Sequence, residues 1–322
     1  MPQGSIYYAV GRLSMLEKTV LDGARLERLL QAKDMEQALR VVSEVGWRDD
    51  LHFEQAAGEH MLQACTLVRE LTTNQALVDA FLVRYDIANL KILLKARALQ
   101  QEPAALSACG VFAPDVLRHA VNEHRYNALG TVLKTALDAL EKHLAVDMNP
   151  MDIDVHLDRA HYAYAFDKLG SKGGTAVKYF RDKVDLTNYA MVLRAMHQNK
   201  PLAFIKPLLI PGGRVAPAAW EKDYVRPEKL PLRMNHLGAA IYASAVAAHL
   251  NPQKLAAFER DADNHLLGLF TPYRRTISRE ERLIGHLLMR EREAAAVRLI
   301  LSGKENGFAE ETIRERLRAL YG

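Results

Sequence analysis

Cysteine is nearly absent from this sequence: the 322 residues include two, Cys65 and Cys109. Two cysteines in unrelated contexts cannot build a disulfide framework or, by themselves, a thiolate metal site. Long apolar runs are missing as well, because the longest mild stretch, 237–250, falls short of the roughly 20 residues that cross a bilayer. We expect a buried helix there. The first residues also lack the pattern of a signal peptide, so a cytoplasmic protein is expected.

Charge of a single sign is lacking too. The 43 basic and 39 acidic residues are interspersed and leave a formal net charge of +4. Without a concentrated basic patch or an aromatic platform, nucleic-acid binding is not expected. The hydrophobic share of 49% and the charged share of 25% are those of a soluble globular protein, and the length suggests about two or three units.

Strand patterns are nearly absent, since no sustained two-residue alternation is bounded by hairpin turns. Helical periodicity dominates instead, and between residues 15 and 47 apolar side chains recur at three- and four-residue steps with charges between them. Asp34 is placed to cap a helix that starts at Met35, and Gly130 marks a break between two helices. The sequence predicts an all-α, multihelical fold.

Recognisable catalytic and metal motifs are missing. The segment 152–161, rich in Asp and His, fails the spacing of a calcium loop and of a helical zinc site, and a helix with acids in its first turn explains it better. Gly170, Gly173 and Gly174 fail the spacing of a phosphate loop and instead predict a helix end and a turn. We therefore expect no catalytic residue, no cofactor, no metal and no small-molecule substrate.

An enzymatic alternative would need distant residues to meet in the fold. His119, Glu123 and His161 are candidates for such an assembled site. A shared pocket with strongly shifted acidities would support this alternative, and burial in separate helix packings would end it.

The sequence does contain one helical motif in three copies, and we call each copy a phrase. RYDIANLKILLKAR at 84–97 and KVDLTNYAMVLRAM at 183–196 are offset by 99 residues, and HLLMREREAAAVRLILSGK at 286–304 is a weaker copy. In each copy an aromatic or aliphatic residue precedes an acid, and an aliphatic triplet follows. The matched residues are Phe81, Asp86 and Asn89, then Phe180, Asp185 and Asn188, then Leu288 and Glu293 with Ala296 replacing the Asn. We expect each acid to act as an N-cap or to lie in the first turn of its helix.

A turn that opens another helix follows each copy. The three turns are GVFAPDVL, GGRVAPAAW and NGFAEETI, in which Ala113, Ala216 and Ala309 correspond. A helix phrase with its exit signal, repeated in order, predicts internal triplication with a period near one hundred residues. We expect three similar helical subdomains, at 1–112, 113–215 and 216–322.

One local run of positive charge occurs at 272–282, PYRRTISREER. A basic run is usually a solvated face, but this one is also the best local candidate for docking an acidic partner surface. The arginines we assign to that docking are Arg274, Arg275 and Arg282.

Together these phrases resemble the triplicated helices of the C subunit of the V-type (archaeal and bacterial A/V-type) ATP synthase, a relative of the eukaryotic V-ATPase d subunit. The opening GRLSMLEKTVLDGARLERLLQAKDMEQALRVV is similar to the first helices of that family, HLDRAHYAYAFDKL to its Leu-Asp-Arg-x-Tyr helix, and LLIPGG to its post-helix turn. The resemblance runs from about residue 5 to 320. It departs from the family at Ala296 and in the shortened connection after the third phrase.

The resemblance implies a funnel of three helical subdomains carried on the rotor of the complex. Its cavity would receive the central shaft, made of the D and F subunits, and its base would sit on the membrane-embedded proteolipid ring, with the stator I/a subunit as a further candidate neighbour. No nucleotide would be bound and no bond made or broken. The protein would be cytoplasmic and peripherally attached to the membrane sector. A helical-repeat adaptor unrelated to rotary ATPases is the alternative from a different class.

Overall fold

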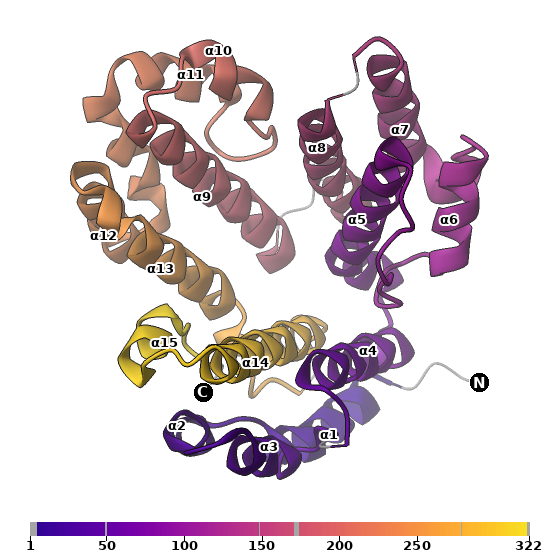
Figure 1. Cartoon of the computed structure of the whole chain (residues 1–322), viewed down its shortest axis with the longest axis vertical. Helices are drawn as coiled ribbons and strands as arrows, with labels where there is room; N and C mark the ends of the chain where they lie inside the picture. The colour runs from indigo at the N-terminus through magenta and orange to yellow at the C-terminus, as the bar shows by residue number, and fades with distance from the viewer. Residues whose placement is uncertain (1–4, 49, 148, 171–173, 278, 321–322) are drawn as a thin grey trace. The chain divides into compact units, whose positions relative to one another are not determined.

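A computed structural model describes residues 5–48, 50–147, 149–170, 174–277 and 279–320. Helices follow one another through these ranges with no strand among them, which confirms the all-α prediction (Figure 1). By their contacts the residues form two compact units. Unit 1 joins Met1–Gln75 to Glu259–Gly322, and unit 2 is Ala76–Phe258. These boundaries differ from those expected after residues 112 and 215, and the division into three subdomains stays a prediction.

Unit 1 is built from both ends of the chain. Its α-helices are α1 (Ile6–Leu16), α2 (Gly23–Gln31), α3 (Met35–Ser43), α4 (Phe53–Leu71), α14 (Glu281–Glu305) and α15 (Glu310–Arg316). The long helices α4 and α14 lie side by side and form its centre (Figure 1). Ala57 and Ala64 of α4 are buried, as are Leu283 and Leu287 of α14, and small side chains allow neighbouring helices to approach closely. The third phrase therefore packs on helices that the sequence places at the opposite end.

Unit 2 contains the other two phrases. Its α-helices are α5 (Gln75–Leu99), α6 (Pro114–Asn122), α7 (Gly130–Leu144), α8 (Pro150–Leu169), α9 (Thr175–His197), α10 (Leu202–Ile205), α11 (Pro217–Val225) and α12 (Ala239–Leu250), and α13 (Leu255–Gly268) crosses into unit 1. Short 3-10 segments lie between them, the longest being η4 (Pro227–Leu237).

One core of unit 2 surrounds α5. Val83, Leu90 and Leu94 of this helix are buried against Leu117 of α6 and Leu133 of α7, together with apolar residues of α8. Burying each such side chain contributes roughly 1.5–3 kcal/mol, so the set outweighs the helical propensity of any one segment.

The second core of unit 2 surrounds α9. Tyr189 lies 5.0 Å from the ring of Phe258 and 6.3 Å from that of Trp220, and its hydroxyl donates to the carbonyl of Ala245 at 2.8 Å. Phe81 and Phe180, the matched aromatic residues of the first two phrases, lie 4.9 Å apart between ring centroids. The two phrase helices of unit 2 therefore meet at corresponding positions.

Local expectations have mixed outcomes. Asp34 accepts a hydrogen bond from the amide of Gln37 at 2.8 Å, as an N-cap should, and α7 begins at Gly130. Gly170, with φ of +65°, ends α8, while the predicted turn at 171–173 lies outside the described residues. The buried helix expected at 237–250 is wrong in part, because α12 starts at Ala239 and buries a single face, leaving Leu250 exposed.

Candidate functional site

The acid of the first phrase lies in the interior of its helix. Asp86 stands near the middle of α5, fully buried, and its carboxylate accepts hydrogen bonds from two backbone amides outside the helix: Val111 at 2.6 Å and Phe112 at 3.0 Å. These amides belong to the turn that leads through Ala113 into α6. The carboxylate thus clamps the start of one helix to the middle of another.

The asparagine of the phrase completes this clamp. Asn89 lies one helical turn after Asp86, so both side chains point to the same side. Its amide donates to the carbonyl of Ser107 at 2.8 Å and accepts from the Ser107 amide at 2.8 Å. Gly110 supplies the space, because a Cβ there would lie 2.1 Å from an Asp86 oxygen.

The second phrase repeats the arrangement. Asp185, buried within α9, accepts from the amides of Arg214 at 3.0 Å and Val215 at 3.1 Å. Asn188 donates to and accepts from the backbone of Ile210 at 2.8 and 2.9 Å. A Cβ on Gly213 would lie 2.1 Å from an Asp185 oxygen, as at Gly110.

Opposing effects act on the pKa of Asp185 in the second clamp. Burial raises the pKa of Asp185, while the two amides and His236, whose Nε2 lies 3.2 Å away, counter part of that effect. The ionised carboxylate is therefore held by hydrogen-bond donors against the tendency of its site to neutralise it.

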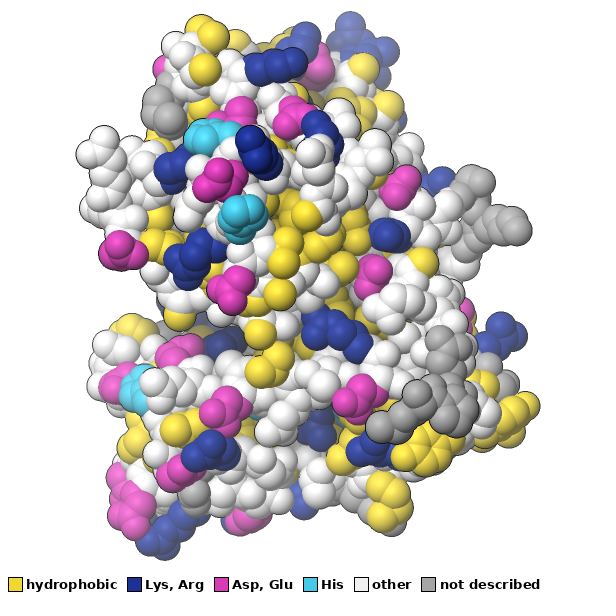
Figure 2. Space-filling model, turned by 90° about the vertical axis from the view of Figure 1, so that its right-hand side faces the viewer, with side chains coloured by type: hydrophobic (Ala, Val, Ile, Leu, Met, Phe, Trp, Pro, Cys, Tyr) yellow, Lys and Arg dark blue, Asp and Glu magenta, His cyan; other side chains and the backbone are white. Residues whose placement is uncertain are grey.

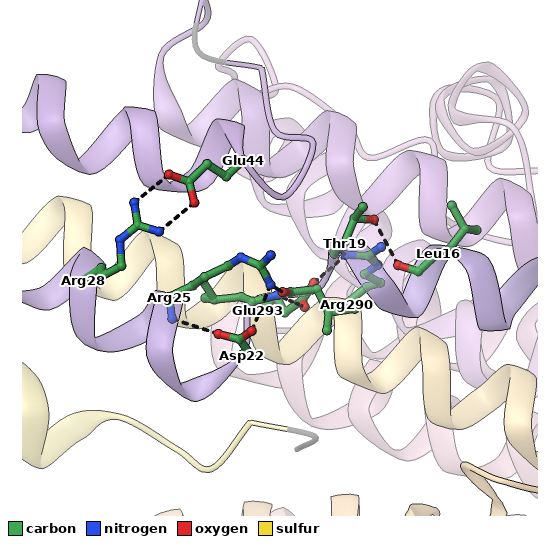
Figure 3. A network of polar contacts seen from close by, with 10 residues as sticks. Leu16, Thr19, Asp22, Arg25, Arg28, Glu44, Arg290 and Glu293 are labelled. Atoms are coloured by element: carbon green, nitrogen blue, oxygen red, sulfur yellow. Dashed lines mark hydrogen bonds and ion pairs between the residues drawn. The ribbon is translucent and has the colours of Figure 1, made fainter.

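The acid of the third phrase binds a segment near the N-terminal end of the chain. Glu293, buried in α14, accepts from the amide of Leu21 at 2.7 Å, and Leu21 directly precedes Asp22, the N-cap of α2. Phe112 and Val215 occupy the same place relative to their helices, one residue before the caps Ala113 and Ala216. Figure 3 shows Glu293 and Arg290 of α14 directed at this N-terminal segment.

The third clamp also differs in its partners. Arg290 donates to Glu293 at 2.8 Å, and the Nε2 atom of His60 lies 3.5 Å from the same carboxylate. Ala296 takes the place of the asparagine and is buried. The connection that follows the phrase is short, so the carboxylate holds the segment before α2 instead.

The helix ends agree across the three copies. Gln100, Asn199 and Gly307 have φ of +53°, +52° and +68°, the left-handed geometry that closes a helix. The amide after each bonds back to a carbonyl five residues earlier, from Gln101 to Ala96, Lys200 to Ala195 and Phe308 to Gly303, at 2.9, 2.9 and 2.8 Å. Ala96, Ala195 and Gly303 all lie ten residues after their acid.

The expected role of the acids as N-caps or first-turn residues is wrong for all three copies. Each acid has a full helical turn or more on either side, and its partners are amides distant in sequence. The signals that indicate the clamp are the asparagine three residues after the acid and the glycine before the turn, at 110 and 213. Phe81, Phe180 and Leu288 are all buried on the same helices.

The three docking arginines have different environments. Arg275 is exposed and Arg274 is half-buried. Arg282 is buried: its guanidinium donates to Glu17 at 3.0 Å, to the Ser14 hydroxyl at 2.8 Å and to the carbonyl of Thr276 at 2.9 Å. A buried guanidinium whose donors bind groups of the same chain is not available to a partner protein, so the docking assignment is wrong for Arg282.

The residues of the enzymatic alternative occupy unlike environments. His119 and Glu123 are exposed at the end of α6. His161 is buried in α8, 4.8 Å from the ring of Tyr162, and burial holds its pKa well below the usual value. The structure therefore does not bring the three into a shared enclosed pocket.

Two kinds of feature are absent from the described ranges. No group of three or more His, Cys, Asp or Glu side chains there could hold a metal ion. None of the helices there is both long and apolar enough to cross a membrane.

Known proteins resemble this chain over most of its length. The profile of the family described as ATP synthase (C/AC39) subunit matches residues 9–316. The A-type ATP synthase C subunit of Thermococcus onnurineus is 22% identical over 96% of this chain and 88% of its own length, and that of Methanosarcina mazei 24% identical over 96% and 92%. The V-type sodium ATPase C subunit of Enterococcus hirae is 22% identical over 84% of each. This chain belongs to the ATP synthase (C/AC39) subunit family.

Proposed function

We propose that this protein is a non-catalytic rotor subunit that couples a shaft of the D and F subunits to a membrane proteolipid ring. Family membership supports a place in a rotary ATPase. The observation that carries the finer proposal is the recurrence of a buried acid that holds the backbone just before a helix cap, at Asp86, Asp185 and Glu293. A part that passes torque between two bodies must resist deformation, and the clamps provide such resistance.

The stiffness follows from how the clamps are built. Each buried carboxylate is bound to one or two backbone amides distant in sequence, so it fixes the path of the chain between two helices. Hydrogen bonds to a charged acceptor are shorter and stronger than neutral ones, and in a buried site they are not weakened by competing water. Close-packed helices around them deform little.

The same contacts favour a structural role over a catalytic one. The carboxylates of Asp86 and Asp185 are bound to amides of their own fold. A general acid or base needs access to a substrate proton, and these buried groups are committed elsewhere.

The proposal places the contacts with the ring on the basic segment 272–282. Arg275 and Arg279 are exposed there, and Arg274 is half-buried. On the face shown in Figure 2, Lys and Arg are interspersed with Asp and Glu. We propose three similar helical subdomains around a cavity for the shaft, with the stator I/a subunit as a further neighbour and the protein attached peripherally at the cytoplasmic side of the membrane sector.

Binding to each partner separately tests this function. The purified chain is passed over immobilised D/F complex and over the ring in nanodiscs, and we expect it to be retained by both. Reversing the charge at Arg275 and Arg279 to Glu should weaken retention on the ring by about tenfold or more and leave D/F binding unchanged. Arg40→Glu, at an exposed position of α3, is the control. Retention by neither partner would contradict the proposal.

A further inference from the structure

A pocket of about 510 Å³ opens in unit 1 between α1, α4 and α14. Leu16, Leu62 and Leu67 form its apolar wall, Arg12 and Glu70 lie at its exposed mouth, and His60, His286 and Arg290 contribute buried side chains. Its size lies within the range of small-molecule sites, which combine apolar walls with a few convergent polar groups.

The buried polar side chains of this pocket are incompletely bonded. His286 is 2% exposed, and its Nδ1 atom has no hydrogen-bond partner among the described residues. His60 stacks on Trp47 with ring centroids 4.5 Å apart, and its Nε2 atom faces the Glu293 carboxylate at 3.5 Å. Buried polar atoms in native proteins are nearly always paired, so an unpaired imidazole nitrogen at this pocket, that of His286, points to a missing ligand.

The fixed charges around the pocket cancel. Arg282 pairs with Glu17 at 3.0 Å and Arg290 with Glu293 at 2.8 Å, and at the mouth Arg12 and Glu70 are opposite in sign. Burial and the neighbouring arginines lower the pKa of His286 to about 3, and burial also lowers the pKa of His60. Both imidazoles are therefore neutral near pH 7, and the region has no net charge.

We propose that this pocket binds a monovalent organic anion with a short apolar tail, of the monocarboxylate class, together with one proton. The carboxylate meets the unpartnered Nδ1 atom of His286 beside His60 and Arg290, and the tail lies against Leu16 and Leu67. Because the surrounding charges sum to zero, one proton taken up by an imidazole balances one negative charge. A dianion would leave a charge unpaired beside Glu293 and Glu70 and is disfavoured.

Proton uptake makes binding depend on pH in a defined direction. The bound anion stabilises imidazolium, so the imidazole pKa is higher in the complex than in the free protein. Affinity therefore rises as pH falls, by at most about tenfold per pH unit for one proton. This inference is independent of the proposed rotor function, because it rests on unit 1 alone.

Calorimetry on the full-length chain with hexanoate, acetate and inorganic phosphate tests the proposal. We expect hexanoate to bind at least about tenfold more tightly than acetate, because its extra methylenes reach the apolar wall. Phosphate should bind more weakly than hexanoate. The binding enthalpy of hexanoate should vary with the ionisation enthalpy of the buffer in proportion to about one proton taken up.

Two variants and a control locate the site. His286→Gln and His60→Gln should each weaken hexanoate by about tenfold or more and reduce proton uptake, while His119→Gln, an exposed histidine on α6, should change neither. Failure of hexanoate to bind, binding without proton uptake, or equal affinity for acetate and hexanoate would each overturn the proposal. The proton count needs the unaltered protein alone, so a variant that fails to fold does not remove the test.

Discussion

A carboxylate buried in the middle of a helix needs partners outside it, because the helix has already used its own backbone amides. Asp86 and Asp185 find these partners in the turn that begins the next helix. Each side chain therefore accepts from two amides of that turn. Without the carboxylate these amides would lack this acceptor, or the turn would have to adopt another conformation. The asparagine three residues later satisfies one more amide and one carbonyl of the same segment.

Removing one of these carboxylates should be costly. We expect Asp86→Ala and Asp185→Ala each to lower the free energy of unfolding by about 3 kcal/mol, because two amides lose a charged acceptor. Chemical denaturation monitored by circular dichroism measures the change. Asp158→Ala, which removes a half-exposed partner of Lys91, should cost about 1 kcal/mol or less. Equal losses at Asp158 and Asp86 would contradict the clamp.

The glycine beside each carboxylate gives a second prediction. Gly110→Ala places a Cβ into the Asp86 carboxylate and should destabilise by about 2 kcal/mol. Gly58→Ala, at an exposed position of α4 where nothing lies within 4 Å, should instead stabilise by about 0.5–1 kcal/mol. In the double variant Gly110→Ala with Asp86→Ala, the combined loss should be smaller than the sum of the two single losses, since the clash is gone. Strict additivity in thermal or chemical denaturation would count against the close approach.

The buried histidines of unit 1 predict an acid-sensitive fold. The pKa of His286 falls to about 3 on folding, so below its unfolded pKa of about 6.5 the unfolded chain binds more protons. Stability should therefore be full above about pH 6.5 and decline toward pH 3, by at most about 1.4 kcal/mol per pH unit for this group. His286→Gln should flatten the decline, and denaturation across this range measures it. An unchanged slope in the variant would show that other groups cause the loss.

At the scale of elements, α5, α9 and α14 are versions of one helix. They share a buried acid, a left-handed residue after the last turn and a following helix whose cap has nearly the same backbone angles, at Ala113, Ala216 and Ala309. In α14 the clamped segment lies before α2 rather than after α14. A buried acid that holds the segment before a helix thus occurs between neighbouring segments, at Asp86 and Asp185, and between the two ends of the chain, at Glu293.

The sequence reveals the repetition but not the contacts that the repeated residues make. Matching Asp86 to Asp185 and Ala113 to Ala216 depends on order and spacing, which a linear reading preserves. The partner of Asp86 lies 25 residues away at Val111, and that of Glu293 is Leu21, so neither follows from local propensity. The docking assignment of Arg282 is wrong for the same reason, because the burial of that side chain depends on Glu17 at the other end of the chain.

Glu293 should hold unit 1 in particular. Glu293→Gln leaves Arg290 buried without its carboxylate, and we expect a loss of about 3 kcal/mol. Hydrogen exchange should show the added opening in α4 and α14, while α5 and α9 keep their protection. Glu305→Gln, at a half-exposed end of the same helix, should change stability by less than about 0.5 kcal/mol. Uniform deprotection of all four helices would contradict a clamp local to unit 1.

At the scale of the whole molecule, one unit is continuous and the other is assembled from two distant segments. Unit 1 needs α14 because α4 buries Ala57, Cys65 and Val68 in a packing that includes that helix. Unit 2 carries both complete clamps within residues 76–258. The two units should therefore differ in their ability to fold alone.

Fragments test this difference. Residues 76–258 should fold cooperatively, because both cores and both clamps are included. Residues 1–112, the first subdomain expected from the sequence, should fail to form a stable α4, since α14 is absent. Urea unfolding followed by circular dichroism distinguishes the outcomes. A cooperative transition in the 1–112 fragment with protected α4 amides would contradict the assembly of unit 1 from both chain ends.

The proposed coupling is tested most directly by asking whether this protein joins ring and shaft. Proteolipid rings are immobilised singly, labelled D/F is added, and the fraction of rings that hold a shaft is counted with and without the chain. The account predicts that rings retain the shaft when the chain is present and lose it when the chain is omitted. Shaft retention that is equal in both cases would contradict it.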